Sequence, residues 1–234
     1  MTTPRYIELI GLPGAGKTTA AKLLAGSLAE SGIESTQRTP LNAGIFRKLS
    51  IVFGVCALLL RVPSLLGLWR YSVRAEYRGT PYARSVVQNV RARLLVEAVV
   101  VRQLCALHNK ILVNDEGLIG KLVVFSILTG MREDRMIKLL HRVLPTNTCV
   151  VYVHTPTEVA VDRALERDII IPFFHEMDAE ERMRFYTLNA EWYSSVCERL
   201  QHTHGIQTIR IANTNTHDDL KKEIDQLVAL QYRE

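Results

Sequence analysis

The chain has 234 residues, of which 47% are hydrophobic and 23% are charged. These values are typical of one folded domain with a substantial core; they exclude a disordered chain and leave too little length for two large domains. The N-terminus lacks a basic start followed by an apolar core, so we expect a cytoplasmic protein. The four cysteines lack the close spacing of a zinc site or redox motif, and we expect reduced, mostly buried thiols.

An apolar strand, expected over residues 6–10, runs into the segment GLPGAGKTT and then into an alanine- and leucine-rich helix. The spacing of Gly11, Gly16, Lys17 and Thr18 is that of a nucleoside-triphosphate phosphate loop. Glycines let backbone N–H groups face an anion, and the helix contributes its positive end. We expect Lys17 to reach the terminal phosphates and Thr18 to bind Mg²⁺, whereas a turn that binds nothing would need neither side chain. The nucleotide-binding residues predicted here are Gly11, Pro13, Gly14, Ala15, Gly16, Lys17, Thr18 and Thr19.

The rest of the chain alternates between strand and helix patterns. Strands are expected over residues 6–10, 33–38, 110–115, 148–154 and 206–211. Helices are expected over 17–31, in much of 41–107, and over about 119–143, 156–168, 179–201 and 217–230. Five apolar strands separated by helices predict an α/β fold of three layers, the P-loop NTPase fold, with a five-stranded parallel sheet flanked by helices. We expect one domain over 1–234, with a core at 1–40 and 108–234 and a helical, arginine-rich insert at about 41–107.

The insert carries the excess positive charge of the chain, whose net charge is +5. Residues 61–102 contain eight arginines and two glutamates, a net charge of +6, so the rest of the chain has a net charge of −1. Such a patch attracts an anionic small molecule, a nucleic acid or an acidic membrane face, although most such arginines simply face solvent. Nucleic acid is not the partner that we expect. The sequence is compatible with a homodimer, but it carries no clear oligomerisation signal.

Residues 49–69 of the insert are apolar enough to raise the question of a membrane span. Arg61 and Pro63 interrupt the stretch, and its longest uncharged run is about half of what a span requires. We therefore expect a buried helix pair or an apolar lid over a substrate pocket. The alternative is peripheral membrane contact through about 49–70, because flanking basic residues suit acidic lipid headgroups.

Two carboxylates, Asp115 and Glu116, follow the strand expected at 110–115. The carboxyl end of a parallel strand is where ligands bind in open α/β sheets. We expect Asp115 to hold Mg²⁺ opposite Thr18, although capping of the next helix is compatible with the same position. Glu116 either activates water, which gives hydrolysis, or holds Mg²⁺ or accepts the proton of a substrate hydroxyl, which gives a kinase.

Arg163 and Arg167 follow the strand expected at 148–154 and lie four residues apart, on one face of a helix. Phosphoryl transfer needs cations around the migrating group, and a mobile arm of arginines supplies them as the site closes. The alternative is that both arginines pair with the carboxylates beside them on the same helix.

Taken in order, these motifs resemble the thymidylate kinase-like and deoxynucleoside kinase-like P-loop kinases. The resemblance rests on the phosphate loop, on NDEG, on HTPTEVAVDRALERD and on the segment from RFYTLNAEWY to the last helix, about two thirds of the chain. It implies that Arg163 and Arg167 belong to a lid and that Asn213 and Thr214 lie near the adenine.

The chain also departs from this family. Thymidylate kinases usually carry Asp-Arg where this chain has Asp115 and Glu116, and Arg-Glu-Pro where it has Arg-Thr-Pro, so an established thymidylate kinase is not expected. In the family, the helix before the third strand carries an arginine that binds the phosphate of the acceptor. By that likeness Arg91 and Arg93, together with Arg38, are the candidates that bind an anionic acceptor.

The sequence therefore predicts an ATP- and Mg²⁺-dependent kinase. It would transfer the γ-phosphoryl group to a nucleoside, a nucleotide or another small hydroxyl or phosphate acceptor. The alternatives are an ATPase or switch that uses Glu116 for hydrolysis and docks a partner or membrane through the insert, and a domain that only senses nucleotide. The predicted catalytic residues are Lys17, Asp115, Glu116, Arg163 and Arg167.

Overall fold

The computed structural model describes most of the chain, namely residues 4–37, 45–74, 81–107, 110–115, 117–166, 177–213 and 216–232. Four of the predicted site residues, Arg38, Glu116, Arg167 and Thr214, lie outside the described residues.

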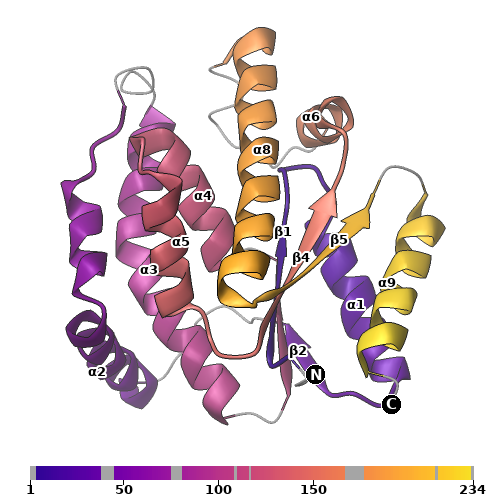
Figure 1. The fold of residues 1–234 in the computed structure, drawn as a ribbon, viewed down its shortest axis with the longest axis horizontal. Helices are drawn as coiled ribbons and strands as arrows, with labels where there is room; N and C mark the ends of the chain where they lie inside the picture. The colour runs from indigo at the N-terminus through magenta and orange to yellow at the C-terminus, as the bar shows by residue number, and fades with distance from the viewer. Residues whose placement is uncertain are drawn as a thin grey trace.

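The centre of the molecule is a sheet of five parallel strands, as predicted, and the structure gives their order as β2-β3-β1-β4-β5 (Figure 1). The strands are β1 Tyr6–Ile10, β2 Ser35–Gln37, β3 Ile111–Asn114, β4 Thr148–His154 and β5 Gln207–Ala212. β1 lies in the middle and is buried along its whole length, which explains its apolar sequence. The carboxyl ends of β1 and β3 are adjacent, so this order brings the phosphate loop next to the residue that follows β3.

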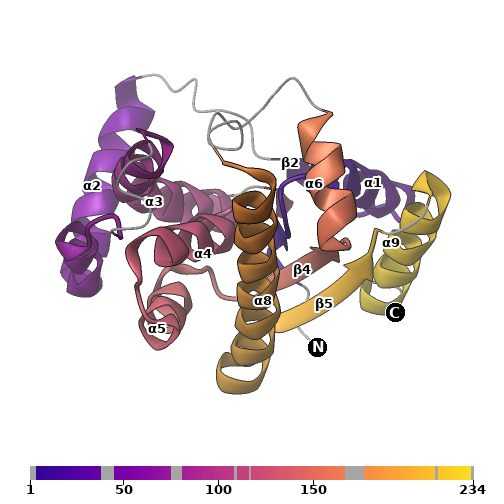
Figure 2. The same cartoon turned by 90° about the horizontal axis from the view of Figure 1, so that it is seen from above.

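Helices cover both faces of the sheet (Figures 1 and 2). They are α1 Lys17–Glu30, α2 Ile45–Arg61, the 3₁₀ helix η1 Pro63–Arg70, α3 Pro81–Leu107, α4 Leu118–Thr129, α5 Glu133–Val143, α6 Thr157–Leu165, α8 Ala179–His204 and α9 His217–Tyr232. α1 and α9 pack together on one face, whereas α3, α4, α5 and α8 form the layer on the other. The predicted three-layer α/β architecture is therefore confirmed.

The helical region expected at 119–143 is divided into two helices, α4 and α5. Gly130 adopts a φ of 71° and ends α4, and Arg132 is in an extended conformation, so the chain turns before α5 begins. α4 packs against α3 and α8 as well as β1, which explains why it is apolar on nearly all sides.

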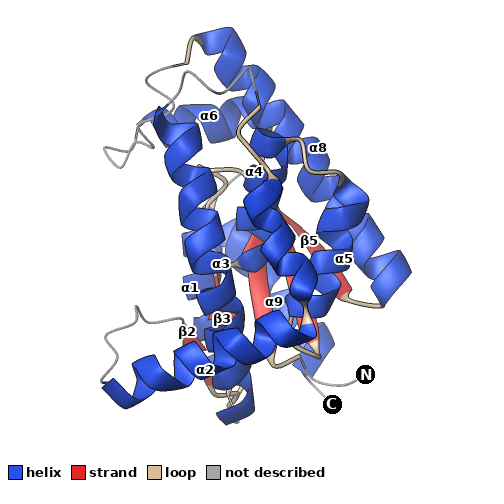
Figure 3. Ribbon diagram, turned by 90° about the vertical axis from the view of Figure 1, so that its left-hand side faces the viewer, coloured by secondary structure: helices blue, strands red, loops and turns tan. Residues whose placement is uncertain are grey.

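α2 and η1 lie outside the two layers, on the outer side of α3 (Figures 1 and 3). Arg61 ends α2 and Pro63 begins η1, as the interruption in the sequence predicted. The described helices include none with the length and hydropathy needed to cross a bilayer. The four cysteines are free thiols; three are buried, and Cys56 of α2 is exposed.

Candidate active site

The loop between β1 and α1 has the conformation that its glycines allow. Gly11, Gly14 and Gly16 have φ values of 151°, 82° and 83°. A Cβ atom at Gly14 would lie 2.1 Å from the carbonyl oxygen of Ala160 in α6. These residues are therefore glycines both because of their backbone angles and because other segments approach them closely.

We predict that Gly14→Ala severely weakens nucleotide binding. The added methyl group must displace the backbone of α6, and a left-handed alanine by itself costs roughly 1–2 kcal/mol of stability. Gly26→Ala is the matched control, because Gly26 lies inside α1 with open space around it; we expect it to leave binding unchanged and to stabilise the fold by up to about 1 kcal/mol. Thermal unfolding and calorimetric titration with nucleotide measure both effects. Equal nucleotide affinity in the two variants would contradict this account of the loop.

Lys17 lies at the start of α1 and folds back over the loop. Its ammonium group donates hydrogen bonds to the carbonyl oxygens of Gly11, at 3.0 Å, and Leu12, at 2.9 Å. These two carbonyl groups hold the ammonium group of Lys17 over the loop. A phosphate oxygen bound by the loop would come within reach of the same ammonium group.

The other side of the loop is held by residues from the ends of β4 and β5. The side-chain amide of Asn213 donates to the carbonyl oxygen of Ala15 at 2.7 Å, and the hydroxyl of Thr155 lies 3.2 Å from the same oxygen. The guanidinium of Arg163 donates to the carbonyl oxygen of Asn213 at 3.3 Å. The structure thus brings together Asn213, predicted near the adenine, and Arg163, predicted in the lid, beside the phosphate loop. Thr155 was not predicted from the sequence.

Thr18 and Asp115 are the residues expected to hold Mg²⁺. Thr18 is exposed in the first turn of α1, and Asp115 is half-buried just after β3. Within the described parts of the chain, no cluster of three or more acidic, histidine or cysteine side chains could hold a metal ion. A hydroxyl and a carboxylate nevertheless fit this ion, because Mg²⁺ in nucleotide sites takes most of its ligands from phosphates and water.

A buried carboxylate, Glu8, lies beneath the site and was not predicted. Its side chain has no exposed surface; it accepts hydrogen bonds from the Tyr6 hydroxyl at 2.9 Å and from the backbone N–H of Ile119 at 2.7 Å. The carboxyl group is so close to Gly117 that a Cβ there would lie 2.1 Å from it. Glu8 therefore fixes the start of α4, directly after the segment that carries Asp115.

Burial raises the pKa of the Glu8 carboxyl from its ordinary value of 4.5 to about 7, against the opposing effect of its hydrogen bonds. Between these two pH values the native protein retains a proton that the unfolded chain has lost, so stability falls as the pH rises through this window. The full effect on the free energy of unfolding is roughly 3 kcal/mol.

We predict that Glu8→Gln flattens the pH dependence of the free energy of unfolding between pH 4.5 and 7, whereas Glu30→Gln, at an exposed position of α1, does not. Parallel pH profiles for Glu8→Gln and the unmodified protein would contradict this prediction.

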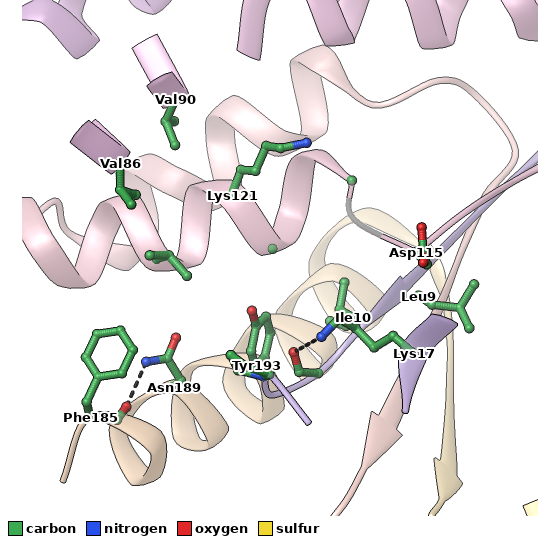
Figure 4. A pocket seen from close by; sticks show the side chains of 15 residues that line it. Leu9, Ile10, Lys17, Val86, Val90, Asp115, Lys121, Phe185, Asn189 and Tyr193 are labelled. Carbon is green, nitrogen blue, oxygen red and sulfur yellow. Dashed lines mark hydrogen bonds between the residues drawn. The ribbon is translucent and has the colours of Figure 1, made fainter. Parts of the chain in front are cut away.

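A cavity of about 230 Å³ opens beside Lys17 and Asp115 (Figure 4). Its walls are mostly apolar and come from the phosphate loop, α3, α4 and α8. The side chains that define it are Val86 and Val90 of α3, Lys121 and Val124 of α4, and Phe185, Asn189 and Tyr193 of α8. The amide of Asn189 is anchored by a hydrogen bond to the Phe185 carbonyl oxygen at 2.7 Å, so its position in the wall is fixed (Figure 4).

Arg91 and Arg93 are not among the described residues that line this cavity. Arg93 is exposed, and Arg91 lines a separate cavity between α3 and the segment after η1. The role predicted for these two residues and Arg38 in binding the acceptor stays a prediction. Besides Lys17, the described lining contains the cation Lys121, which also forms an ion pair with the buried Glu97 at 2.5 Å.

No protein-family model and no curated protein matches the sequence. Among solved structures, deoxyadenosine kinase from M. mycoides with bound dATP is similar with a TM-score of 0.53 and 16% identity, over 95% of this chain and 98% of the kinase. The structure of deoxyadenosine kinase from M. mycoides with bound dCTP is similar with a TM-score of 0.51 and 11% identity, over 96% of this chain and 99% of the kinase. Shikimate kinase from Acinetobacter baumannii in complex with shikimate is similar with a TM-score of 0.50 and 21% identity, over 100% of this chain and 97% of the kinase. The chain therefore has the fold of the P-loop kinases, as its sequence predicted.

Proposed function

We propose that the protein is a phosphotransferase that moves the γ-phosphoryl group of ATP to the hydroxyl or phosphate of a small acceptor. The observation that supports this most directly is the cavity beside the phosphate loop, because Lys17 and Asp115 lie in the same wall as apolar side chains from α3 and α8. An acceptor held there would meet the terminal phosphate, and positioning of this kind supplies much of the catalysis of phosphoryl transfer.

The predicted phosphate-binding, metal-binding and catalytic residues each have a role in this proposal. The loop N–H groups and Lys17 would bind the phosphates, and Thr18 and Asp115 would hold Mg²⁺, which would supply positive charge to neutralise the phosphates. The acceptor oxygen attacks the γ-phosphorus while the bond to the β-phosphate oxygen breaks, and Asp115 or Glu116 takes the hydroxyl proton. Arg163, with Arg167, stabilises the charge on the migrating group.

The walls of the cavity suggest what kind of acceptor binds. A volume of about 230 Å³ suits a small molecule. Valine and phenylalanine side chains favour an apolar or ring-shaped body, whereas Asn189 and Lys121 offer polar contacts. A nucleoside fits this description, and so does another cyclic alcohol. In this proposal residues 41–107 form the acceptor side of one domain whose core is 1–40 and 108–234.

We predict that Val90→Phe raises the KM for the acceptor by about 10- to 100-fold, because a larger side chain overfills the cavity. The affinity for ATP should stay unchanged. Asn89→Ala is the control on the same helix, because Asn89 is exposed and does not line the cavity. An acceptor KM that is insensitive to Val90→Phe would place the acceptor elsewhere.

The proposal is tested by incubating the purified protein with Mg²⁺, γ-labelled ATP and a panel of nucleosides, nucleotides, sugars and cyclic alcohols. Transfer of label to one class of acceptor is the expected result. Steady release of inorganic phosphate without any labelled acceptor would instead favour the ATPase or switch, particularly if Glu116→Gln abolished the release.

A further inference from the structure

α2 and η1 expose an unusual amount of apolar surface. The exposed fractions are 85% for Leu60, 73% for Phe53, 55% for Leu66 and 51% for Trp69. Large exposed hydrophobic residues elsewhere in the described parts of the chain are Leu165 and Leu230 alone. Such a concentration within one short segment indicates an interaction surface.

The spacing of these residues forms a continuous stripe on each helix. On α2, Phe53, Cys56 and Leu60 are exposed at positions i, i+3 and i+7, which lie on one helical face. On η1, Leu66 and Trp69 are exposed three residues apart, as one face of a 3₁₀ helix requires. We call these five side chains the outer stripe.

The opposite faces of the same helices are buried. Exposed fractions are 4% or less for Leu58 of α2 and for three residues that recur every third position, namely Val62, Leu65 and Leu68. The segment therefore has enough apolar residues to pack against the domain on its inner side, and the outer stripe is additional to that packing.

The charged residues of the segment that carries the outer stripe have one sign only. Residues 35–75 contain six arginines and lysines and no aspartate or glutamate. Arg61 and Arg70, at the ends of α2 and η1, are both exposed beside the stripe. An apolar face flanked by cations suits a surface that is apolar inside and anionic outside.

A second cavity adjoins the end of the stripe. Its volume is about 500 Å³, and Trp69 and Arg70 form one part of its wall while Arg84, Gln88 and Arg91 of α3 form another. The Nε atom of Arg91 is buried and finds no hydrogen-bond partner within the described residues. The described lining includes three arginines and no carboxylate, and guanidinium groups are well suited to bind phosphate.

From these observations we propose that the insert docks on an anionic phospholipid surface. The outer stripe inserts at the level of the headgroups, and the arginine-lined cavity binds a lipid phosphate. A second copy of the chain fits less well, because a two-fold contact through this face would bring Arg61 and Arg70 against like charges. A nucleic acid would use the cations but would leave Leu60 and Leu66 without a function. This inference does not depend on the phosphotransferase activity.

Vesicle binding tests the proposal on the full chain. We expect co-sedimentation with phosphatidylcholine vesicles that contain phosphatidylglycerol, weakened by salt, and little with phosphatidylcholine alone. Cys56 provides a readout on the unmodified protein, because it is the exposed thiol on the stripe and the other three cysteines are buried. Anionic vesicles should slow its reaction with a maleimide, and unchanged reactivity in their presence would overturn the proposal.

Variants separate the two parts of the surface. The double variant L60E/W69E should lower the vesicle partition coefficient by about tenfold or more, and Arg91→Gln should lower it severalfold on anionic vesicles. Leu230→Glu is the matched control, because Leu230 of α9 is 83% exposed, nearly as much as Leu60, and lies away from the insert. Equal losses for Leu230→Glu and L60E/W69E would overturn the proposal. A dimer that L60E/W69E converts to a monomer, or tighter retention by RNA than by anionic vesicles, would also overturn it.

Discussion

Replacing Lys17 by alanine should lower nucleotide-dependent phosphoryl transfer by about 10²–10³-fold. The ammonium group already lies over the phosphate loop, bound to two loop carbonyl oxygens, so its removal takes away a positioned charge at the terminal phosphates. The fold should survive, because Lys17 lies at the surface of the loop and not in the core. Transfer assays with circular dichroism of the same samples measure both effects.

Lys22→Ala is the control for this change. Lys22 is an exposed lysine on the same helix, five residues further along, and it lines neither the loop nor the cavity. Loss of activity in both variants would point to a general effect on α1. Retention of full activity by Lys17→Ala would show that the loop does not act on a phosphate.

The largest effect on stability is expected at Lys121. Its ammonium group pairs at 2.5 Å with Glu97, whose side chain is only 2% exposed, and the pair joins α4 to α3. Lys121→Met removes the cation with which this buried carboxylate pairs, which should destabilise the fold by about 3–5 kcal/mol. Denaturant unfolding at neutral pH measures the change.

A second substitution distinguishes the buried charge from lost packing. In the double variant Glu97→Gln with Lys121→Met both charges are gone, so we expect most of the stability to return. A double variant that is no more stable than Lys121→Met alone would show that the ion pair does not explain the effect. Lys121 also lines the acceptor cavity, so acceptor binding should stay impaired in both.

The sequence was sufficient to predict the elements that depend on local patterns. The glycine spacing predicted the conformation of the loop between β1 and α1, whose binding of phosphate stays a prediction, and the apolar runs predicted five parallel strands, which the structure confirms. Asp115 could be placed beside the loop because the ends of parallel strands meet at one edge of a sheet. Asp115 and the loop are direct neighbours because β3 pairs with β1, and this strand order is known only from the structure.

The acceptor cavity could not be predicted, because its wall joins helices far apart in the sequence. Phe185 and Asn189 of α8 meet Val90 of α3 only in the folded molecule, and nothing in their spacing distinguishes them from core residues. Glu8 did carry a signal that was missed. A carboxylate in the middle of the apolar strand YIELI must be buried with hydrogen-bond partners or a proton, and the structure supplies the hydroxyl of Tyr6 and the N-terminus of α4.

The most direct test is a crystal structure of the protein grown with Mg²⁺ and a non-hydrolysable analogue of ATP. We expect the β- and γ-phosphates on the backbone N–H groups between Gly14 and Thr18, with the metal ion between Thr18 and Asp115. The cavity formed by α3, α4 and α8 should remain open toward the γ-phosphate. A triphosphate bound away from the loop, or an adenine that fills this cavity in place of an acceptor, would contradict the proposed arrangement.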